Sequence, residues 1–170
     1  MNDKLKRLCE LSLLTAVALI IFVVELQIQN PFPIPGIKLG LANIITVYAV
    51  YHYRWYEVSA IVVIRAVLGC IFSGNLPALI YSLSGSILCL VGMLALRKVI
   101  DEKHLWIASV FGALLHNTGQ MAAALVITRT PQLMAYYPFL IVSGCLAGLF
   151  TGLSAQFVTA KLCKIKKERL

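Results

Sequence analysis

Six long apolar runs, separated by short polar segments, dominate the chain. They predict helices at about 10–27, 38–52, 55–73, 77–97, 104–128 and 138–162. A helix rises about 1.5 Å per residue, so an apolar run of about 20 residues crosses roughly 30 Å of hydrocarbon with its backbone hydrogen bonds made internally. The pattern therefore predicts an all-α integral membrane protein with six transmembrane helices. Because the second helix is short, we expect it to be tilted, broken or partly covered by the loop before it.

The composition favours the same class of protein. Of the 170 residues, 60% are apolar and 13% are charged, and the mean hydropathy is +0.87. A soluble domain usually carries about 25% charged residues, so the charges here are too few to cover a surface that faces water. No stretch is rich enough in Pro, Gly and Ser to form a linker. We therefore expect residues 1–170 to form a single membrane domain.

The basic residues predict the orientation in the membrane. Twelve of the 15 lysines and arginines fall on one side of the expected helices: Lys4, Lys6, Arg7, Arg54, Arg97, Lys98, Lys103, Lys161, Lys164, Lys166, Lys167 and Arg169. Loops rich in Lys and Arg stay in the cytoplasm. We therefore expect a multi-pass protein of the cytoplasmic membrane with both termini in the cytoplasm. The net charge of +8 is then a topology signal and requires no nucleic acid.

Polar side chains inside the expected helices are the candidate functional residues, because such groups are costly in hydrocarbon. They are Glu25, Lys38, Asn43, Arg65, His116, Asn117 and Gln120. When the helices run alternately outward and inward, all seven fall in the outer half of the membrane. The simplest interpretation is one polar cavity that opens toward the outside.

Three of these residues lie together on the fifth expected helix. Gln120 lies four residues after His116 and three after Asn117, and side chains at these spacings are neighbours on a helix. The amides could recognise polar edges of a ligand, and His116 could bond the ligand or respond to protonation. Alternatively, Asn117 and Gln120 only join neighbouring helices by hydrogen bonds.

The segment before the second helix is the candidate lid. Pro33 and Pro35 stiffen the chain between residues 30 and 37, and Gly36 permits a tight bend. We expect this segment to cover the outer mouth of the cavity. It also directs the amino end of the second helix into the cavity, where the helix dipole favours an anion.

The charges in the expected cavity favour an anionic ligand such as a carboxylate or a phosphate. Lys38 and Arg65 are positive, Glu25 is negative, and the helix amino end adds partial positive charge. The alternative is that Glu25 pairs with Lys38 or Arg65 in a buried salt bridge and that nothing binds there.

A ridge of small residues predicts close helix packing. Gly144, Gly148 and Gly152 recur every four residues along the sixth helix, and such spacing lets another backbone approach closely. The ridge packs either against a helix of the same chain or against a partner membrane subunit.

The sequence argues against catalysis by this chain alone. Asp3 and Asp101 are its only aspartates, and neither lies within an expected membrane span, so no aspartate-rich pair can hold Mg²⁺ against a diphosphate. The cysteines are scattered singly, and no cluster indicates a metal site. The sequence also identifies no cofactor.

Several motifs together resemble one known family. They are PGIKLGLAN at residues 35–43, Arg65, Ser84-Gly85 and HNTGQ at residues 116–120. Over nearly the whole chain the sequence resembles the Gx transporter family, which is also catalogued as heptaprenyl diphosphate synthase component I. That family in turn resembles the substrate-binding (S) components of energy-coupling factor (ECF) vitamin transporters. Those components are six-helix proteins that bind a vitamin from the outer side, beneath the loop that joins their first two helices.

The resemblance implies more than one function. As an ECF S-component-like bundle, the chain would capture a small anionic solute from outside, in a flavin or quinone context, and dock on a membrane coupling subunit. S components dock through an Ala-x-x-x-Ala ridge on helix 1, whereas this chain has Ser12 and Ala16. As component I, it would be a non-catalytic subunit of heptaprenyl diphosphate synthase in menaquinone biosynthesis. A further alternative is a scaffold subunit of a membrane redox complex. We take the first function as the hypothesis, with the seven polar residues as the ligand site.

Overall fold

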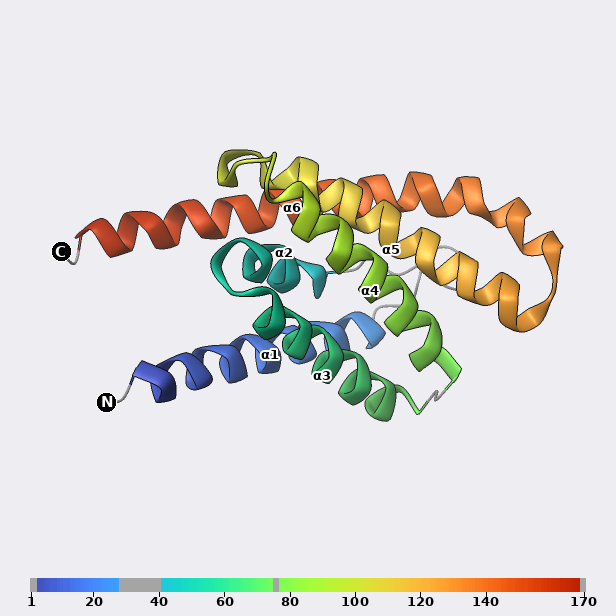
Figure 1. Ribbon diagram of the computed structural model, residues 1–170, viewed down its shortest axis with the longest axis horizontal. Coiled ribbons are helices and arrows are strands. Elements are labelled where there is room, and N and C mark those ends of the chain that lie inside the picture. Colours follow the sequence, from blue (N-terminus) through green and yellow to red (C-terminus); the bar gives the residue numbers. More distant parts are fainter. Residues whose placement is uncertain (1–2, 28–40, 75–76, 169–170) are drawn as a thin grey trace.

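The computed structural model describes residues 3–27, 41–74 and 77–168. These residues form six α-helices and two short 3₁₀ helices, and they contain no strand (Figure 1). The elements are α1 (Asp3–Gln27), α2 (Asn43–His52), α3 (Trp55–Ser73), α4 (Pro77–Leu96), η1 (Glu102–His104), α5 (Leu105–Thr128), η2 (Pro131–Tyr136) and α6 (Tyr137–Glu168). The expected all-α bundle of six helices is thus confirmed.

Five of the six helices are long and apolar enough to cross a membrane, and α2 is the exception among the described residues. Apolar side chains such as Leu13, Ile20 and Phe157 are exposed on the outside of the bundle. In water such a surface would be unstable, whereas lipid covers it at no cost. The chain is therefore a membrane protein.

Two helices extend past their expected bounds. Helix α1 begins at Asp3 rather than near residue 10, and α6 continues to Glu168 rather than ending near residue 162. Hydropathy locates the apolar part of a helix but does not detect charged helical turns beyond it. In α1 these turns are held by an ion pair: Arg7 donates from Nε and Nη2 to the two carboxylate oxygens of Glu57 on α3, at 2.8 Å each.

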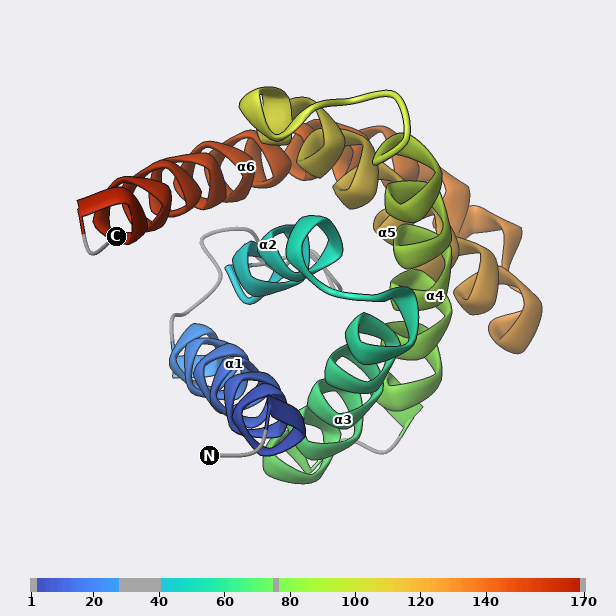
Figure 2. The ribbon, with the colours of Figure 1, turned by 60° about the vertical axis from the view of Figure 1, so that its left-hand side comes forward.

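Helix α2 lies at the centre of the bundle. Figure 2 shows the other five helices arranged around it, and it contacts every one of them. With ten residues it is about 15 Å long, roughly half of the hydrocarbon thickness. Backbone at membrane depth is tolerated when protein surrounds it. The side chains that α2 buries include Thr46, Val47 and Val50.

The glycine ridge of α6 packs against α5. A Cβ added at Gly148 would lie 2.7 Å from Cα of Val110, and one added at Gly152 would lie 2.5 Å from Cα of Trp106. At Gly144 the nearest atom would be Nδ2 of Asn117, at 2.6 Å. The ridge is thus taken up by packing within the chain, which leaves no room on that face for the backbone of a partner subunit.

Substitution of a ridge glycine should separate α5 from α6. We expect Gly148→Ala to lower the free energy of unfolding by about 1–3 kcal/mol, because its Cβ meets backbone that cannot move alone. The control is Gly92→Ala, whose Cβ meets Cδ1 of Leu115, the far end of a flexible side chain. Unfolding by SDS in mixed micelles measures both. Equal losses for the two variants would contradict the assigned packing.

Candidate functional site

Three of the predicted site residues meet where α1, α2 and α3 converge. Arg65 on α3 is 9% exposed, and its Nη1 donates to Oδ1 of Asn43 at 3.3 Å. Asn43 is the first residue of α2. Glu25, near the end of α1, is 8% exposed and interacts electrostatically with the Arg65 guanidinium. We call Glu25, Asn43 and Arg65 the Arg65 cluster.

The Arg65 cluster fits both interpretations that the sequence allows. A buried guanidinium is stable in a membrane span only when partners compensate its charge, and Glu25 supplies part of that compensation. The guanidinium has five N–H donors in a fixed fork, and one of them is used on Asn43. A planar fork of this kind also matches a carboxylate or a phosphate.

A small void of mixed polar and apolar lining lies beside Asn43. It is enclosed by residues of α2, α4, α5 and α6, including Thr46, Ser109 and Thr151, and its volume is about 10 Å³. Within the described part of the chain, Oγ1 of Thr46 is buried without a hydrogen-bond partner. A void of this size holds one water molecule at most. This void is therefore too small for a solute.

The three polar residues of α5 contact two different helices, α6 and α4. Nδ2 of Asn117 donates to the backbone carbonyl of Leu140 on α6 at 2.7 Å. His116 and Gln120 instead lie against α4: a Cβ added at Gly85 would be 3.1 Å from Cε1 of His116 and 2.7 Å from Cγ of Gln120. Asn117 therefore joins α5 to α6, as the alternative interpretation expected of it.

Some of the predicted site lies outside the described residues. This applies to Lys38 and to the expected lid with Pro33, Pro35 and Gly36. That they complete the Arg65 cluster remains a prediction.

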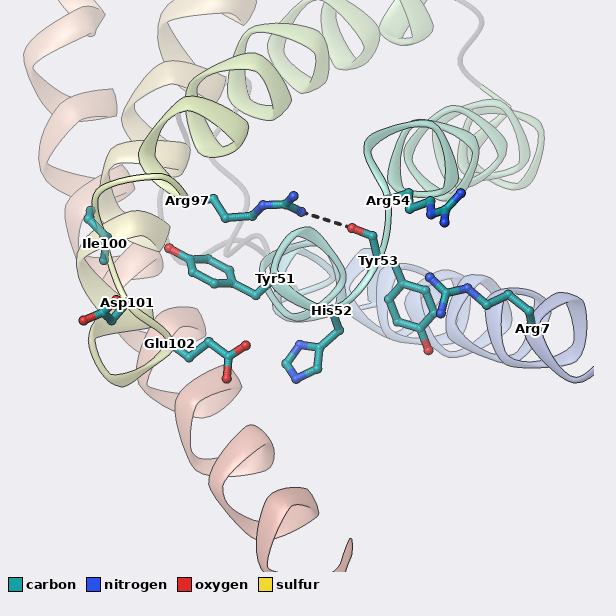
Figure 3. Close-up of a pocket in the computed structure, with 9 residues that line it drawn as sticks. All are labelled: Arg7, Tyr51, His52, Tyr53, Arg54, Arg97, Ile100, Asp101 and Glu102. Atoms are coloured by element: carbon teal, nitrogen blue, oxygen red, sulfur yellow. Dashed lines mark hydrogen bonds between the residues drawn. The ribbon is translucent and has the colours of Figure 1, made fainter. Parts of the chain in front are cut away.

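Sequence analysis missed a second site, at the end of the bundle that gathers the basic loops. A cavity of about 430 Å³ lies there between the ends of α1, α2 and α4 and the start of η1 (Figure 3). We call it the basic-end cavity. It is lined by Arg7, Tyr51, His52, Tyr53, Arg54, Arg97, Ile100, Asp101 and Glu102. In the sequence the basic residues are a topology signal, and their spacing along the chain does not reveal that they converge.

Arg97, which follows α4, caps the carboxyl end of α2 at this cavity. Its Nη1 donates to the carbonyl of Val50 at 2.6 Å and to that of Tyr53 at 3.1 Å. The last carbonyls of a helix have no partner within the helix, and a cation there also opposes the helix dipole. Arg97 thus satisfies the carboxyl end of α2.

Arg7 and Tyr53 form another wall of the cavity. The guanidinium of Arg7 lies over the Tyr53 ring, 4.7 Å from its centroid. Burial and the nearby Glu10 carboxylate raise the pKa of Tyr53 to about 12. The phenol therefore stays protonated at neutral pH, and it donates to Oε2 of Glu10 at 3.3 Å.

The fold and these sites define an all-α membrane protein with buried charge inside the bundle and an arginine-lined cavity at one end. A family model described as heptaprenyl diphosphate synthase component I matches residues 14–158. The chain belongs to that family. No curated protein and no solved structure matches the chain. The likeness to ECF S components therefore remains a prediction.

The role of Asn117 can be tested by its effect on stability. We expect Asn117→Ala to lower the free energy of unfolding by about 1 kcal/mol, because it removes a hydrogen bond between two membrane helices. Ser143→Ala is the matched control, since Ser143 donates to the same Leu140 carbonyl from within α6, at 3.2 Å. Unfolding by SDS distinguishes the variants. An Asn117→Ala protein as stable as wild type would contradict the assigned contact.

Proposed function

We propose that this chain is a non-catalytic, ligand-binding membrane component that captures a small anionic solute at the Arg65 cluster. The observation that carries the proposal is a guanidinium buried within a membrane-spanning helix, beside the first residue of a helix that begins inside the bundle. Ionisable groups at such depth commonly mark ligand or ion pathways.

The amino end of α2 supports an anionic ligand. The residue before the helix is Ala42, whose methyl side chain cannot accept a hydrogen bond from the first turn. The N–H groups of that turn and the helix dipole favour negative charge. With Arg65 beside them, positive charge exceeds the single carboxylate of Glu25. Broken helices of transporters use their amino ends toward anionic substrates in the same way.

His116, Gln120 and Lys38 belong to this proposal as further ligand residues. His116 and Gln120 reach the α4–α5 contact at Gly85, and both carry groups that can hydrogen-bond a polar ligand. Asn117 has its amide nitrogen on Leu140, which leaves its side-chain oxygen as the atom that would meet a ligand. The proposed orientation places the Arg65 cluster toward the outside and the basic-end cavity in the cytoplasm.

A second candidate function follows from the family match. As component I, the chain would be the membrane subunit of heptaprenyl diphosphate synthase, and a partner subunit would carry the catalytic aspartates. This chain has two aspartates, Asp3 and Asp101, which is too few for an aspartate-rich diphosphate site. The proposed orientation would present the basic-end cavity to a soluble partner.

The first candidate is tested by what the protein retains. Native mass spectrometry of the chain, gently extracted from its own membranes, should show one small anionic molecule per chain. We expect Arg65→Met to abolish retention, because the anion loses its charged donor. Arg129→Met is the control, since Arg129 is exposed at the end of α5. Equal retention by a stably inserted Arg65→Met protein would refute the proposed site.

The second candidate is tested by association. If the chain is component I of a working synthase, a soluble prenyl synthase subunit should co-purify with it. Chain elongation by that subunit in vesicles should rise at least about tenfold when this chain is added. Synthase activity that is the same with and without the chain would reject this candidate while leaving the solute site open.

A further inference from the structure

An apolar groove runs along α1 and α3. Its volume is about 380 Å³, and its lining includes Leu11, Ala16 and Leu19 of α1 and Ala60, Ile64 and Leu68 of α3. Ala16 and Ala60 are exposed, and their small side chains leave the space between the two helices open to the membrane. Because both helices are long and apolar enough to span the bilayer, the hydrocarbon chain of a lipid is the natural occupant of this groove.

The groove meets the basic-end cavity at a charged junction. Glu57 lines the groove, and Arg7 and Arg54 line the cavity. The Glu57 carboxylate accepts hydrogen bonds from Nη2 of Arg7 and from the backbone N–H of Arg54, at 2.8 Å each. A molecule with an apolar chain in the groove would therefore bring its first polar atoms to these two arginines.

The junction lies at the depth of lipid head groups. Trp55 and Tyr56 begin α3 directly after Arg54, and they are 64% and 48% exposed. Exposed Trp and Tyr side chains of membrane proteins gather at the membrane–water interface. The Arg54 guanidinium donates to the Tyr56 hydroxyl at 3.2 Å, which holds it at this depth. A guanidinium there can donate two parallel hydrogen bonds to a phosphate.

The charges in the rest of the cavity balance one another. Apart from Arg7, which is paired at the junction, the described lining carries Arg54 and Arg97 as cations and Asp101 and Glu102 as anions. Figure 3 shows the two carboxylates across the cavity from Arg54, with Arg97 between them. The carboxylates would repel a bare anion, whereas a ligand with separate positive and negative groups matches both sides.

Opposite charges converge on the Tyr51 hydroxyl. Arg97, Asp101 and Glu102 all act on it electrostatically, and it is buried with no hydrogen-bond partner in the described part of the chain. Arg97 caps α2 through Nη1 alone, which leaves Nε and Nη2 for a phosphate. The cation and the carboxylates are therefore close enough for one head group to meet both.

We propose that the basic end of the bundle binds one phosphatidylethanolamine molecule. One acyl chain lies in the α1–α3 groove, the phosphate lies between Arg54 and Arg97, and the ammonium group lies at Asp101 and Glu102. The ammonium group has three N–H donors, and carboxylates accept them. The second acyl chain stays in the surrounding bilayer. The site shares no residue with the Arg65 cluster and does not depend on solute capture there.

The experiment titrates the full chain, stripped of lipid in detergent, with phosphatidylethanolamine and counts bound lipids by native mass spectrometry. We expect one tight site per chain. Its dissociation constant should be at least about tenfold lower than those for phosphatidylcholine and phosphatidylglycerol with the same acyl chains. A choline group has no N–H to donate to the carboxylates, and a glycerol head group brings them no cation.

Variants of the lining test each part of the site. Arg54→Gln should weaken binding at least about tenfold, because a charged donor to the phosphate is lost, and Ala60→Phe should weaken it similarly by filling the groove. Glu102→Gln should remove most of the preference for phosphatidylethanolamine over phosphatidylcholine, an effect that misfolding does not produce. The matched controls are Lys98→Gln, at the same end and outside the cavity, and Val63→Phe, on the exposed side of α3.

Three results would overturn the proposal. If phosphatidylcholine binds as tightly as phosphatidylethanolamine, the carboxylates take no part in recognition. If phosphatidylglycerol binds as tightly, the site recognises anionic lipid. If soluble phosphoethanolamine displaces the bound lipid as well as intact phosphatidylethanolamine does, the groove takes no part.

Discussion

The structure depends on one constraint. Helix α2 is too short to cross a membrane, and yet it lies at the centre of a bundle of membrane-spanning helices. Both ends of a helix carry backbone groups without partners, and inside a bilayer only protein or trapped water can supply them. At the carboxyl end Arg97 donates to the carbonyls of Val50 and Tyr53. At the amino end Arg65 bonds the side chain of Asn43. Two arginines from neighbouring helices thus hold α2 in place.

The same constraint generates both candidate sites. Helix α2 begins inside the bundle and ends at its basic end, so polar groups gather beyond each of its ends, and polar groups within a membrane protein are candidate ligand sites. The Arg65 cluster occupies one end and the basic-end cavity the other. About 15 Å of helix separates them, with the apolar core residues Val47 and Val50 between. At the amino end we propose that a small anionic solute binds.

The sequence predicted the parts of this arrangement that depend on composition along the chain. Length and hydropathy predict six helices and a short second one, and depth along each helix places Glu25, Asn43 and Arg65 in one region. The sequence could not predict that Asn117 contacts α6 while His116 and Gln120 contact α4. Residue spacing shows which side chains share a helix face, but it does not show which helix packs against that face. It also could not reveal the basic-end cavity, since Arg97 gains its role only when the end of α4 folds back over α2.

The central claim is that the amino end of α2 and Arg65 together form an anion site inside the membrane. The most direct test is an electron cryo-microscopy structure of the chain purified from its own membranes. A bound antibody fragment would make the particle large enough to image. The account predicts density for a small molecule within hydrogen-bond distance of the Arg65 guanidinium and the first turn of α2. A map in which side chains of this chain fill that space completely would contradict it.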